Sequence, residues 1–334
     1  MHNLDLKDKK LLHELDLNSR QSIQKLARKI GLSKDAVKYR MNKLQDEGII
    51  KSYTAVIDTG KLGFLSFRLY LKLYNISPSK KKEILEFLLK KPNLMWLVEV
   101  EGKWDINNAF IFRTVAEMNA VWNELLEKYN NFIDRRELAV FANVYYFNRA
   151  YILGKERREN KIRFLSLPQE EKVDASDLKI IGLLADEARM PIIKIAKEVK
   201  ISAKTVINKI KRLEEKKIIT GYKPEFDLDK LGYQYYKINL STFNTKPEKM
   251  KKLIYYIEQH PNIIYTNEVL GGADIEIEIQ IESPEKLRKL IDSMLEEFSD
   301  MIRDYEILHY YKEYKLRFFP TLTKNIEEGA RNEK

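Results

Sequence analysis

The sequence predicts an α+β protein in which one unit, a helical domain followed by a mixed α/β domain, occurs twice in tandem. Three observations support this fold class: an internal repeat with one constant offset, apolar residues at helical spacing at the start of each copy, and strand-like alternation in the rest of each copy. The 334 residues suffice for several domains, and hydrophobic residues, which make up 44% of the chain, suffice for their cores.

The repeat emerges when the sequence is shifted by 169 residues, because residues 4–147 then align with residues 173–316 without a gap. Identical residues recur along this alignment, for example Asp8 as Asp177. An ungapped match of this length indicates duplication of a complete unit. The predicted domains are 1–60 and 173–229 (helical) and 61–147 and 230–320 (α/β), with 148–172 as a linker and 321–334 as a polar tail.

Three helices are predicted in the first helical domain, at residues 7–15, 22–30 and 33–47. In the second of them, Ile23, Leu26 and Ile30 form one apolar face. Gly31 follows at a position where helices commonly end in a left-handed residue, and Ser33 can cap the next helix. Helix, tight turn and helix is the helix-turn-helix arrangement, whose second helix enters the major groove of DNA.

The rest of unit one has a different rhythm. Leu65, Phe67 and Leu69 alternate with polar residues, which is the period of a half-buried strand. A helix at 78–91, strands at 94–100 and 106–112, a helix at 115–129 and a strand at 137–147 follow. Unit two repeats this order with strands at 233–243, 263–269, 275–281 and 305–315 and helices that begin at Pro247 and Pro284. The order βαββαβ predicts a ferredoxin-like domain in each unit.

This ordered series resembles the Lrp/AsnC family (leucine-responsive, or feast/famine, regulators), and the resemblance covers both units. It rests on the motifs Asp8-x-x-Leu11, Leu26-Ala-Arg-Lys-Ile-Gly-Leu-Ser33, Val37-x-x-Arg40-x-x-x-Leu44, Gly48-Ile49-Ile50, Lys61-Leu62-Gly63 and Gly102-x-x-Asp105. The resemblance implies winged-type helix-turn-helix domains, ferredoxin-like domains of the RAM/Lrp type, and a transcription regulator that binds specific sequences of double-stranded DNA. A chain that carries two units departs from the usual one-unit design.

Composition excludes several classes of function. Lys and Arg total 60 against 50 Asp and Glu, a net charge of +10 that suits a polyanionic partner. Cysteine is absent, which excludes disulfide scaffolds, thiol nucleophiles and thiolate zinc sites. The sequence also contains no membrane span, signal peptide, P-loop or metal cluster that we recognise. We therefore expect a cytoplasmic protein without a metal, cofactor or membrane partner.

The outer face of the recognition helix in each unit supplies the candidate DNA contacts. Asn42 can pair with adenine, and Lys34 or Lys38 with guanine or phosphate. An ordinary solvated helix face is the alternative for each single residue. The predicted contacts are Ser33, Lys34, Asp35, Lys38, Tyr39, Arg40, Asn42 and Lys43 in unit one, and Ser202, Lys204, Asn208, Lys209, Lys211 and Arg212 in unit two.

The two recognition helices differ in ways that predict an asymmetric DNA target. Lys200, Lys209 and Lys217 stand where unit one has Gly31, Arg40 and Gly48. Asp35 can accept a hydrogen bond from cytosine, whereas Lys204 at the equivalent position favours phosphate or guanine. We expect unit one to contribute more base discrimination and unit two more electrostatic affinity.

Two loops of the α/β domains lie where the resemblance implies a small amino-acid effector. The predicted effector residues are Gly102, Asp105, Gly271 and Asp274. A glycine lets backbone N–H groups approach a carboxylate, and an acidic residue can hold an ammonium group. Two alternatives stay open, because the same residues favour tight β-turns and because the loops can serve only to pack domains together. Trp104 can fill the space that an effector needs.

An enzyme is the main alternative function. The siroheme decarboxylases resemble this family in architecture, and that resemblance implies His and Arg near the second and third strands of the α/β domain. Residues 94–112 and 263–281 contain neither. His260 and His309 lie outside them and are expected to be packed or surface residues, so no enzyme is expected. A further alternative is a regulator that recruits a basal transcription factor.

The oligomeric state depends on how the two α/β domains pair. Half-polar strands with rings such as Tyr70, Tyr146 and Tyr235 suit a buried, partly wet interface. The linker of 25 residues permits pairing within one chain or between two chains. We favour an intrachain pseudo-dimer, because a tethered partner has an effective concentration in the roughly millimolar range. A homodimer of such pseudo-dimers stays open.

Overall fold

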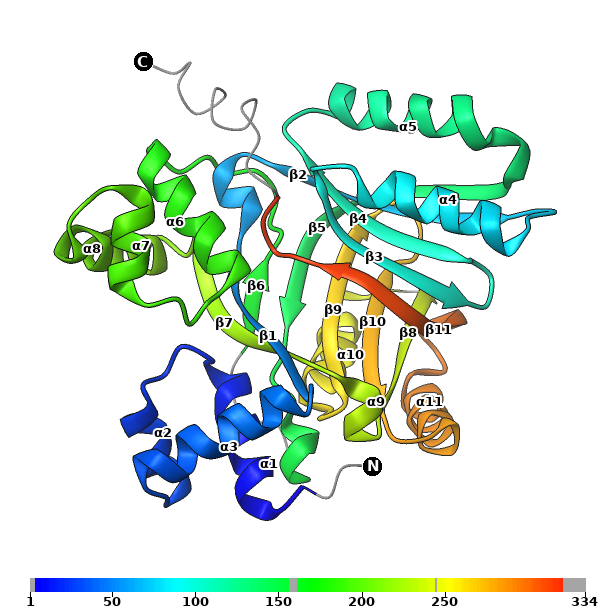
Figure 1. Ribbon diagram of the computed structural model, residues 1–334. Helices are drawn as coiled ribbons and strands as arrows, with labels where there is room; N and C mark the ends of the chain where they lie inside the picture. The colour runs from blue at the N-terminus through cyan, green and yellow to red at the C-terminus, as the bar shows by residue number, and fades with distance from the viewer. Residues whose placement is uncertain (1–3, 156–160, 244, 321–334) are drawn as a thin grey trace.

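The computed structural model describes residues 4–155, 161–243 and 245–320 (Figure 1). Each half begins with a three-helix domain, as predicted. These helices are α1 (Leu6–Leu17), α2 (Ile23–Ile30) and α3 (Lys34–Asp46) in the first half and α6 (Ala175–Asp186), α7 (Ile192–Val199) and α8 (Ala203–Glu215) in the second. The tail predicted for residues 321–334 lies outside the described residues.

Local capping explains where the first three helices begin and end. Ser22 Oγ accepts a hydrogen bond from the Lys25 amide at 3.2 Å, and Ser33 Oγ accepts one from the Ala36 amide at 3.1 Å. Gly31 ends α2 with φ of 66°. The capping prediction for Gly31 and Ser33 is therefore confirmed.

The order βαββαβ is confirmed in both halves. It comprises β2 (Leu65–Leu73), α4 (Pro78–Leu89), β3 (Leu94–Glu101), β4 (Ile106–Phe112), α5 (Val115–Tyr129) and β5 (Ile133–Tyr146) in the first half. In the second half it comprises β8 (Gln234–Thr242), α10 (Pro247–Gln259), β9 (Ile263–Leu270), β10 (Ile275–Ile281), α11 (Pro284–Phe298) and β11 (Ile302–Leu316). Short turns of helix are η1 (Thr59–Leu62), η2 (Asn130–Phe132), η3 (Ala150–Leu153) and α9 (Leu228–Leu231).

The strands of both α/β domains close into one eight-stranded barrel. Their order is β2-β4-β3-β11-β8-β10-β9-β5, and β5 pairs back to β2. The halves meet at β3–β11 and β5–β9, where Glu101 pairs with His309 and Leu270 with Val140. Each of these pairs becomes the other on a shift of 169 residues, so the halves are related by a pseudo-twofold axis. The predicted intrachain pseudo-dimer is confirmed.

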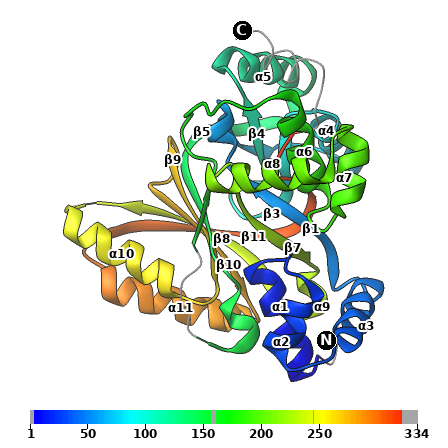
Figure 2. The ribbon, with the colours of Figure 1, turned by 90° about the vertical axis from the view of Figure 1, so that its left-hand side faces the viewer.

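Closure of the barrel buries the polar faces of strands such as β2. Helices α4 and α5 cover the outer face of the first sheet, and α10 and α11 cover that of the second (Figures 1 and 2). The other face of each sheet points into the barrel, where Ser66, Arg68 and Tyr70 of β2 are buried. The second sheet covers this polar face, so β2 contributes to the buried interface that was expected of half-polar strands with rings such as Tyr70.

A two-stranded ribbon that the sequence did not predict joins the helical domains. It pairs β1 (Ile50–Ile57) with β7 (Ile219–Phe226), and Thr54 lies opposite Lys223, its own equivalent in the duplication. Reciprocal hydrogen bonds lock the domains together: Ser19 N donates to Tyr222 O at 2.9 Å, and Ala188 N donates to Tyr53 O at 2.8 Å. Both helical domains lie on one side of the barrel (Figure 1).

The segment predicted as a linker does connect the halves, but its described parts are packed rather than extended. It contains η3 and the strand β6 (Ile162–Phe164), which pairs with β5. Beyond β6, the Ser166 amide donates to Asp58 Oδ1 at 3.0 Å. The absence of strand periodicity was misleading, because the apolar residues Ile162 and Phe164 become buried only against the barrel. Within the described residues, no helix is long and apolar enough to cross a membrane.

Candidate nucleic-acid interface and central cavity

The outer face of α3 presents most of the predicted DNA contacts to solvent. Val37, Met41 and Leu44 are buried beneath the helix. The exposed side chains on the other face are Ser33, Lys34, Asp35, Lys38, Tyr39, Asn42 and Lys43. Tyr39 is 69% exposed although it is large and aromatic, so it does not contribute to the domain core. This face carries cations, an amide and a ring without protein cover.

Arg40 is placed differently from its neighbours on α3. Its Nη1 atom lies 2.7 Å from Asp5 Oδ2 and 2.6 Å from Asp8 Oδ1, at the start of α1. Asp5 also caps α1 through the Asp8 amide, and this bond and Arg40 together hold the pKa of Asp5 below its usual value. The guanidinium therefore braces α3 against α1.

The outer face of α8 is also exposed, but it is more basic. Its predicted contacts Lys204, Asn208 and Lys211 are accessible, as are Ser202 and Arg212. Ile207, between them, is 53% exposed. An exposed isoleucine on this face can contact a thymine methyl group or a protein surface.

Lys209 and Arg212 of α8 reach back to α6. Lys209 Nζ lies 2.6 Å from Asp174 Oδ2 and 3.1 Å from Asp177 Oδ1, and Arg212 pairs with Asp177. Partial burial opposes ionisation of Asp174, but hydrogen bonds from Lys209 and Ser176 hold its pKa well below the usual range. Lys209 thus takes the bracing position that Arg40 has in unit one, while the Arg212 side chain remains partly accessible.

The predicted effector loops lie at the two seams between the halves. A Cβ atom added at Gly102 would approach Ile307 O to 2.8 Å, and one added at Gly271 would approach Leu138 O to 3.3 Å. Each glycine therefore allows its loop to pack against the other half. Trp104 is buried and stacks on Tyr70, with 5.4 Å between ring centroids.

The acidic residues of these loops bind the backbone of their own sheets. Asp105 Oδ2 accepts a hydrogen bond from the Leu73 amide at 2.7 Å. Asp274 Oδ2 accepts bonds from the Thr242 amide at 2.6 Å and its hydroxyl at 3.0 Å. Effector binding at these loops stays a prediction.

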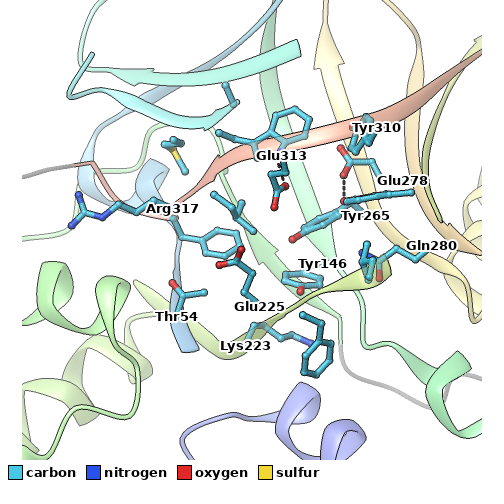
Figure 3. A pocket seen from close by; sticks show the side chains of 18 of the residues that line it. Thr54, Tyr146, Lys223, Glu225, Tyr265, Glu278, Gln280, Tyr310, Glu313 and Arg317 are labelled. Carbon is cyan, nitrogen blue, oxygen red and sulfur yellow. Dashed lines mark hydrogen bonds between the residues drawn. The ribbon is translucent and has the colours of Figure 1, made fainter. Parts of the chain in front are cut away.

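A cavity of about 580 Å³ lies between the β1–β7 ribbon and the interior of the barrel. Its walls come from β7, β10 and β11 of the second half and from β3 and β5 of the first, and the connecting segment adds Arg149 and Phe164. Figure 3 shows Glu225 of β7 and Glu313 of β11 extending into this space from different walls. The cavity is therefore built by both halves.

Buried ion pairs surround the cavity. Arg68 Nη2 lies 3.2 Å from Glu276 Oε2, and Lys237 pairs with the same carboxylate. Burial opposes ionisation of Glu276, but Lys237 and Arg68 hold its pKa below the usual value. Arg149 Nη1 lies 2.6 Å from Asp16 Oδ1 in a second buried pair. Breaking such a pair is strongly destabilising, because it leaves a buried charge uncompensated.

Glu313 differs from these paired groups. Trp96 Nε1 donates to its Oε2 atom at 2.7 Å. Water reaches the side chain through the cavity, but the surrounding protein removes most of its solvation and, with Glu225 and Glu278 close by, raises the pKa of Glu313 to about 7. The carboxyl group therefore changes charge near neutral pH.

Sequence reasoning missed this cavity. Glu278 and Gln280 alternate with isoleucines in β10, a pattern typical of a strand with one wet face, yet both are buried. His309, expected to be a packed or surface residue, lies on the cavity wall with Nδ1 3.2 Å from Glu101 Oε2. The available signal was the excess of polar residues in the strands of unit two.

Comparisons with known proteins agree with the architecture. A family model described as winged helix-turn-helix DNA-binding matches residues 4–51 and 173–220. An uncharacterised HTH-type transcriptional regulator of Pyrococcus horikoshii is 32% identical over 137 residues, which cover 41% of this chain and 88% of the relative.

Two solved structures are similar to the chain over different shares of its length. The siroheme decarboxylase NirDL covers 97% of both chains with a TM-score of 0.64 at 13% identity, a likeness of fold alone. An AsnC family transcriptional regulator from Agrobacterium tumefaciens matches 41% of this chain and 89% of its own, with 22% identity and a TM-score of 0.38. From its two helix-turn-helix matches and its identity to HTH-type regulators, the chain belongs to the Lrp/AsnC family of transcriptional regulators, with the unit of that family present twice.

Proposed function

We propose that the protein regulates transcription by binding a specific sequence of double-stranded DNA through α3 and α8. The observation that carries this proposal is the pair of exposed, cation-rich helix faces that one ribbon holds on a single side of the barrel. A recognition helix positioned in this way can place its N-terminal residues against base edges and its lysines against phosphates.

The chemistry of each face assigns different tasks to the two helices. Asn42 and Asp35 of α3 have the acceptors and donors that discriminate between bases, whereas Lys204 and Lys211 of α8 neutralise phosphates. Arg40 and Lys209 brace their domains, so we assign them to positioning rather than to base contact. The target that fits this arrangement has two unlike half-sites.

Selection from randomised duplexes tests this division of labour. Substituting Asp35 and Asn42 by alanine should flatten the selected motif while leaving much of the affinity at low salt. Substituting Lys204 and Lys211 by alanine should keep the motif but lower the affinity, and it should reduce the slope of log affinity against log salt by about 0.9 for each phosphate that is no longer neutralised. If the wild-type chain enriched all sequences equally, its DNA binding would not be sequence-specific and the proposal would be wrong.

The lining of the cavity argues against a siroheme decarboxylase. One NirDL structure contains an iron-uroporphyrin III analogue, a tetrapyrrole with many carboxylate groups. In this chain Glu225 and Glu313 face the cavity without an ion pair among the described residues, and their carboxylates would repel those of such a ligand. We therefore propose a protein without decarboxylase activity. An amino-acid effector and recruitment of a basal transcription factor stay predictions.

A further inference from the structure

The duplication has diverged where its two copies line the cavity. The frame is symmetric, with strand registers that repeat at the same offset, so packing alone places similar demands on both halves. The equivalent residues nevertheless differ: Glu225, Glu278, Gln280 and Glu313 of the second half stand where the first half has Val56, Ala109, Ile111 and Val144. Glu278 and Gln280 already have protein partners, because Arg68 Nη2 lies 3.7 Å from Glu278 Oε1 and Arg149 Nε donates to Gln280 Oε1 at 2.9 Å. Glu225 and Glu313 have no such cationic partner among the described residues, and these two groups indicate a ligand rather than a packing requirement.

Two symmetry-related places beside the cavity also differ. At the first, the connecting segment covers the chain: the Ser166 hydroxyl donates to Asp58 at 2.9 Å, and the Gln169 amide donates to Gly60 O at 2.8 Å. At the second, the equivalent residues Asp227 and Asp229 line the cavity itself. The second half therefore contributes carboxylates to the cavity wall where the first half is covered by the connecting segment.

The wall of the cavity carries both cations and carboxylates. Most of the lining cations are already paired, as Arg68 with Glu276, Arg149 and Lys223 with Asp16, Lys51 with Asp227 and Arg317 with Asp186. Lys312 instead places its ammonium group over the Tyr314 ring, 4.9 Å from the centroid.

Among the described residues, the lining carboxylates without an ion pair are Glu225, Asp229 and Glu313. Ser52 Oγ donates to Glu225 at 2.9 Å and Trp96 Nε1 donates to Glu313, both neutral donors. Within the described part of the chain, neither carboxylate forms an ion pair. An ammonium group placed between them would supply the missing positive charge.

Aromatic rings form the remaining walls. Trp96, Tyr235 and Tyr310 surround the carboxylates, and the ring centroids of Tyr235 and Tyr310 lie 4.5 Å apart. Tyr310 is only 7% exposed, and its hydroxyl has no hydrogen-bond partner among the described residues. Aromatic faces attract organic cations and also cover an apolar ligand body, and a buried hydroxyl without a partner is a further polar contact for a ligand.

We propose that the central cavity binds a small organic amine as its ammonium ion, held by Glu225 and Glu313 and enclosed by the aromatic walls. The volume of about 580 Å³ lies within the range of roughly 300–1,000 Å³ that is typical of small-molecule sites. A free amino acid fits less well, because its carboxylate would meet the same two glutamates. This site is separate from the Gly102 and Gly271 loops and does not depend on DNA binding.

Isothermal titration calorimetry on the full chain without DNA tests the proposal. The probes are 2-phenylethylamine and hexylamine, with 2-phenylethanol as the uncharged analogue and phenylalanine as the analogue that adds a carboxylate. We expect at least one amine to bind and both analogues to bind at least tenfold more weakly. Because DNA is absent, failure of this experiment leaves the proposed regulatory function untouched.

Three variants locate the site. Glu313→Gln and Glu225→Gln should each weaken amine binding at least tenfold, and Glu313→Val, which copies the residue at the equivalent position 144, should do the same. Glu296→Gln, an exposed substitution on the outer helix α11, serves as the matched control and should bind as the wild type does. The proposal is overturned if neither amine binds, if the alcohol binds as tightly as the amine, or if folded Glu225 and Glu313 variants keep the wild-type affinity.

Discussion

Single side chains of this protein are best understood by asking which partner each one already has. Glu313 has a neutral partner, and loss of solvation at the cavity wall, with Glu225 and Glu278 close by, raises its pKa to about 7, above the value of 4.5 that it would have when unfolded. At a pH below both pKa values, the carboxyl is protonated in the folded and the unfolded state and does not affect stability. As the pH rises from about 4.5 to about 7, the group ionises more readily in the unfolded state, so the folded state loses stability.

Glu313→Gln should therefore stabilise the protein at pH 8 but not at pH 4. The gain should be about 1 kcal/mol, discounted because water reaches the group through the cavity. Urea unfolding at several pH values measures it, with Glu296→Gln as the control. A gain in stability that does not change with pH would show that the charge of Glu313 is not its cause. The nearby charges of Glu225, Glu278 and Lys51 also influence the pKa of Glu313.

Arg40→Ala should affect stability as well as DNA binding. The guanidinium bonds to Asp5 and Asp8 with only a quarter of the side chain exposed, so its removal should cost about 1 kcal/mol of unfolding free energy. Lys38→Ala, on the exposed face of the same helix, should lower DNA affinity without this cost. Thermal unfolding of both variants measures the difference. Equal unfolding midpoints for Arg40→Ala and Lys38→Ala would show that Arg40 does not brace the domain.

At the scale of elements, the turn in each helix-turn-helix domain shows how the second half has drifted from the first. Lys200 and Lys217 adopt φ of 64° and 57°, where Gly31 and Gly48 stand at 66° in the first half. A side chain makes this left-handed conformation costly. Lys200→Gly and Lys217→Gly should therefore each raise stability by about 0.5 kcal/mol, whereas Gly31→Lys should lower it. Calorimetric melting measures the effects, and destabilisation by both glycine variants would show that the lysines make contacts that outweigh the strain.

Elements were predictable wherever the signal was local. The apolar stripe of Ile23, Leu26 and Ile30 and the cap at Ser33 located the helices, because both signals lie within a few residues of sequence. Strand β1 was not predicted, because its buried residues do not alternate with exposed ones once β7 covers them. The cavity was not predicted either, for a related reason. The side of β10 that holds Glu276 and Glu278 is typical of a wet face, and only the distant sheet determines that it is buried.

For the whole molecule, closure of the barrel within one chain predicts the state in solution. Each of the eight barrel strands has a strand neighbour on both sides, so the described residues leave no barrel edge for a second copy to extend. We expect a mass near 39.6 kDa that persists on dilution. Light scattering over a dilution series measures it. A particle of twice this mass that dissociates on dilution would instead support the homodimer left open by the sequence.

The pairing of Thr54 with Lys223 on the pseudo-twofold axis has an evolutionary consequence. In a homodimer every mutation is made twice, so a residue on the axis always meets its own copy and cannot acquire an unlike neighbour. Here one gene encodes both sides of the axis separately, and a threonine can face a lysine. Each side can therefore specialise by single mutations, without a second gene and without the mixed assemblies that two separate subunits would form.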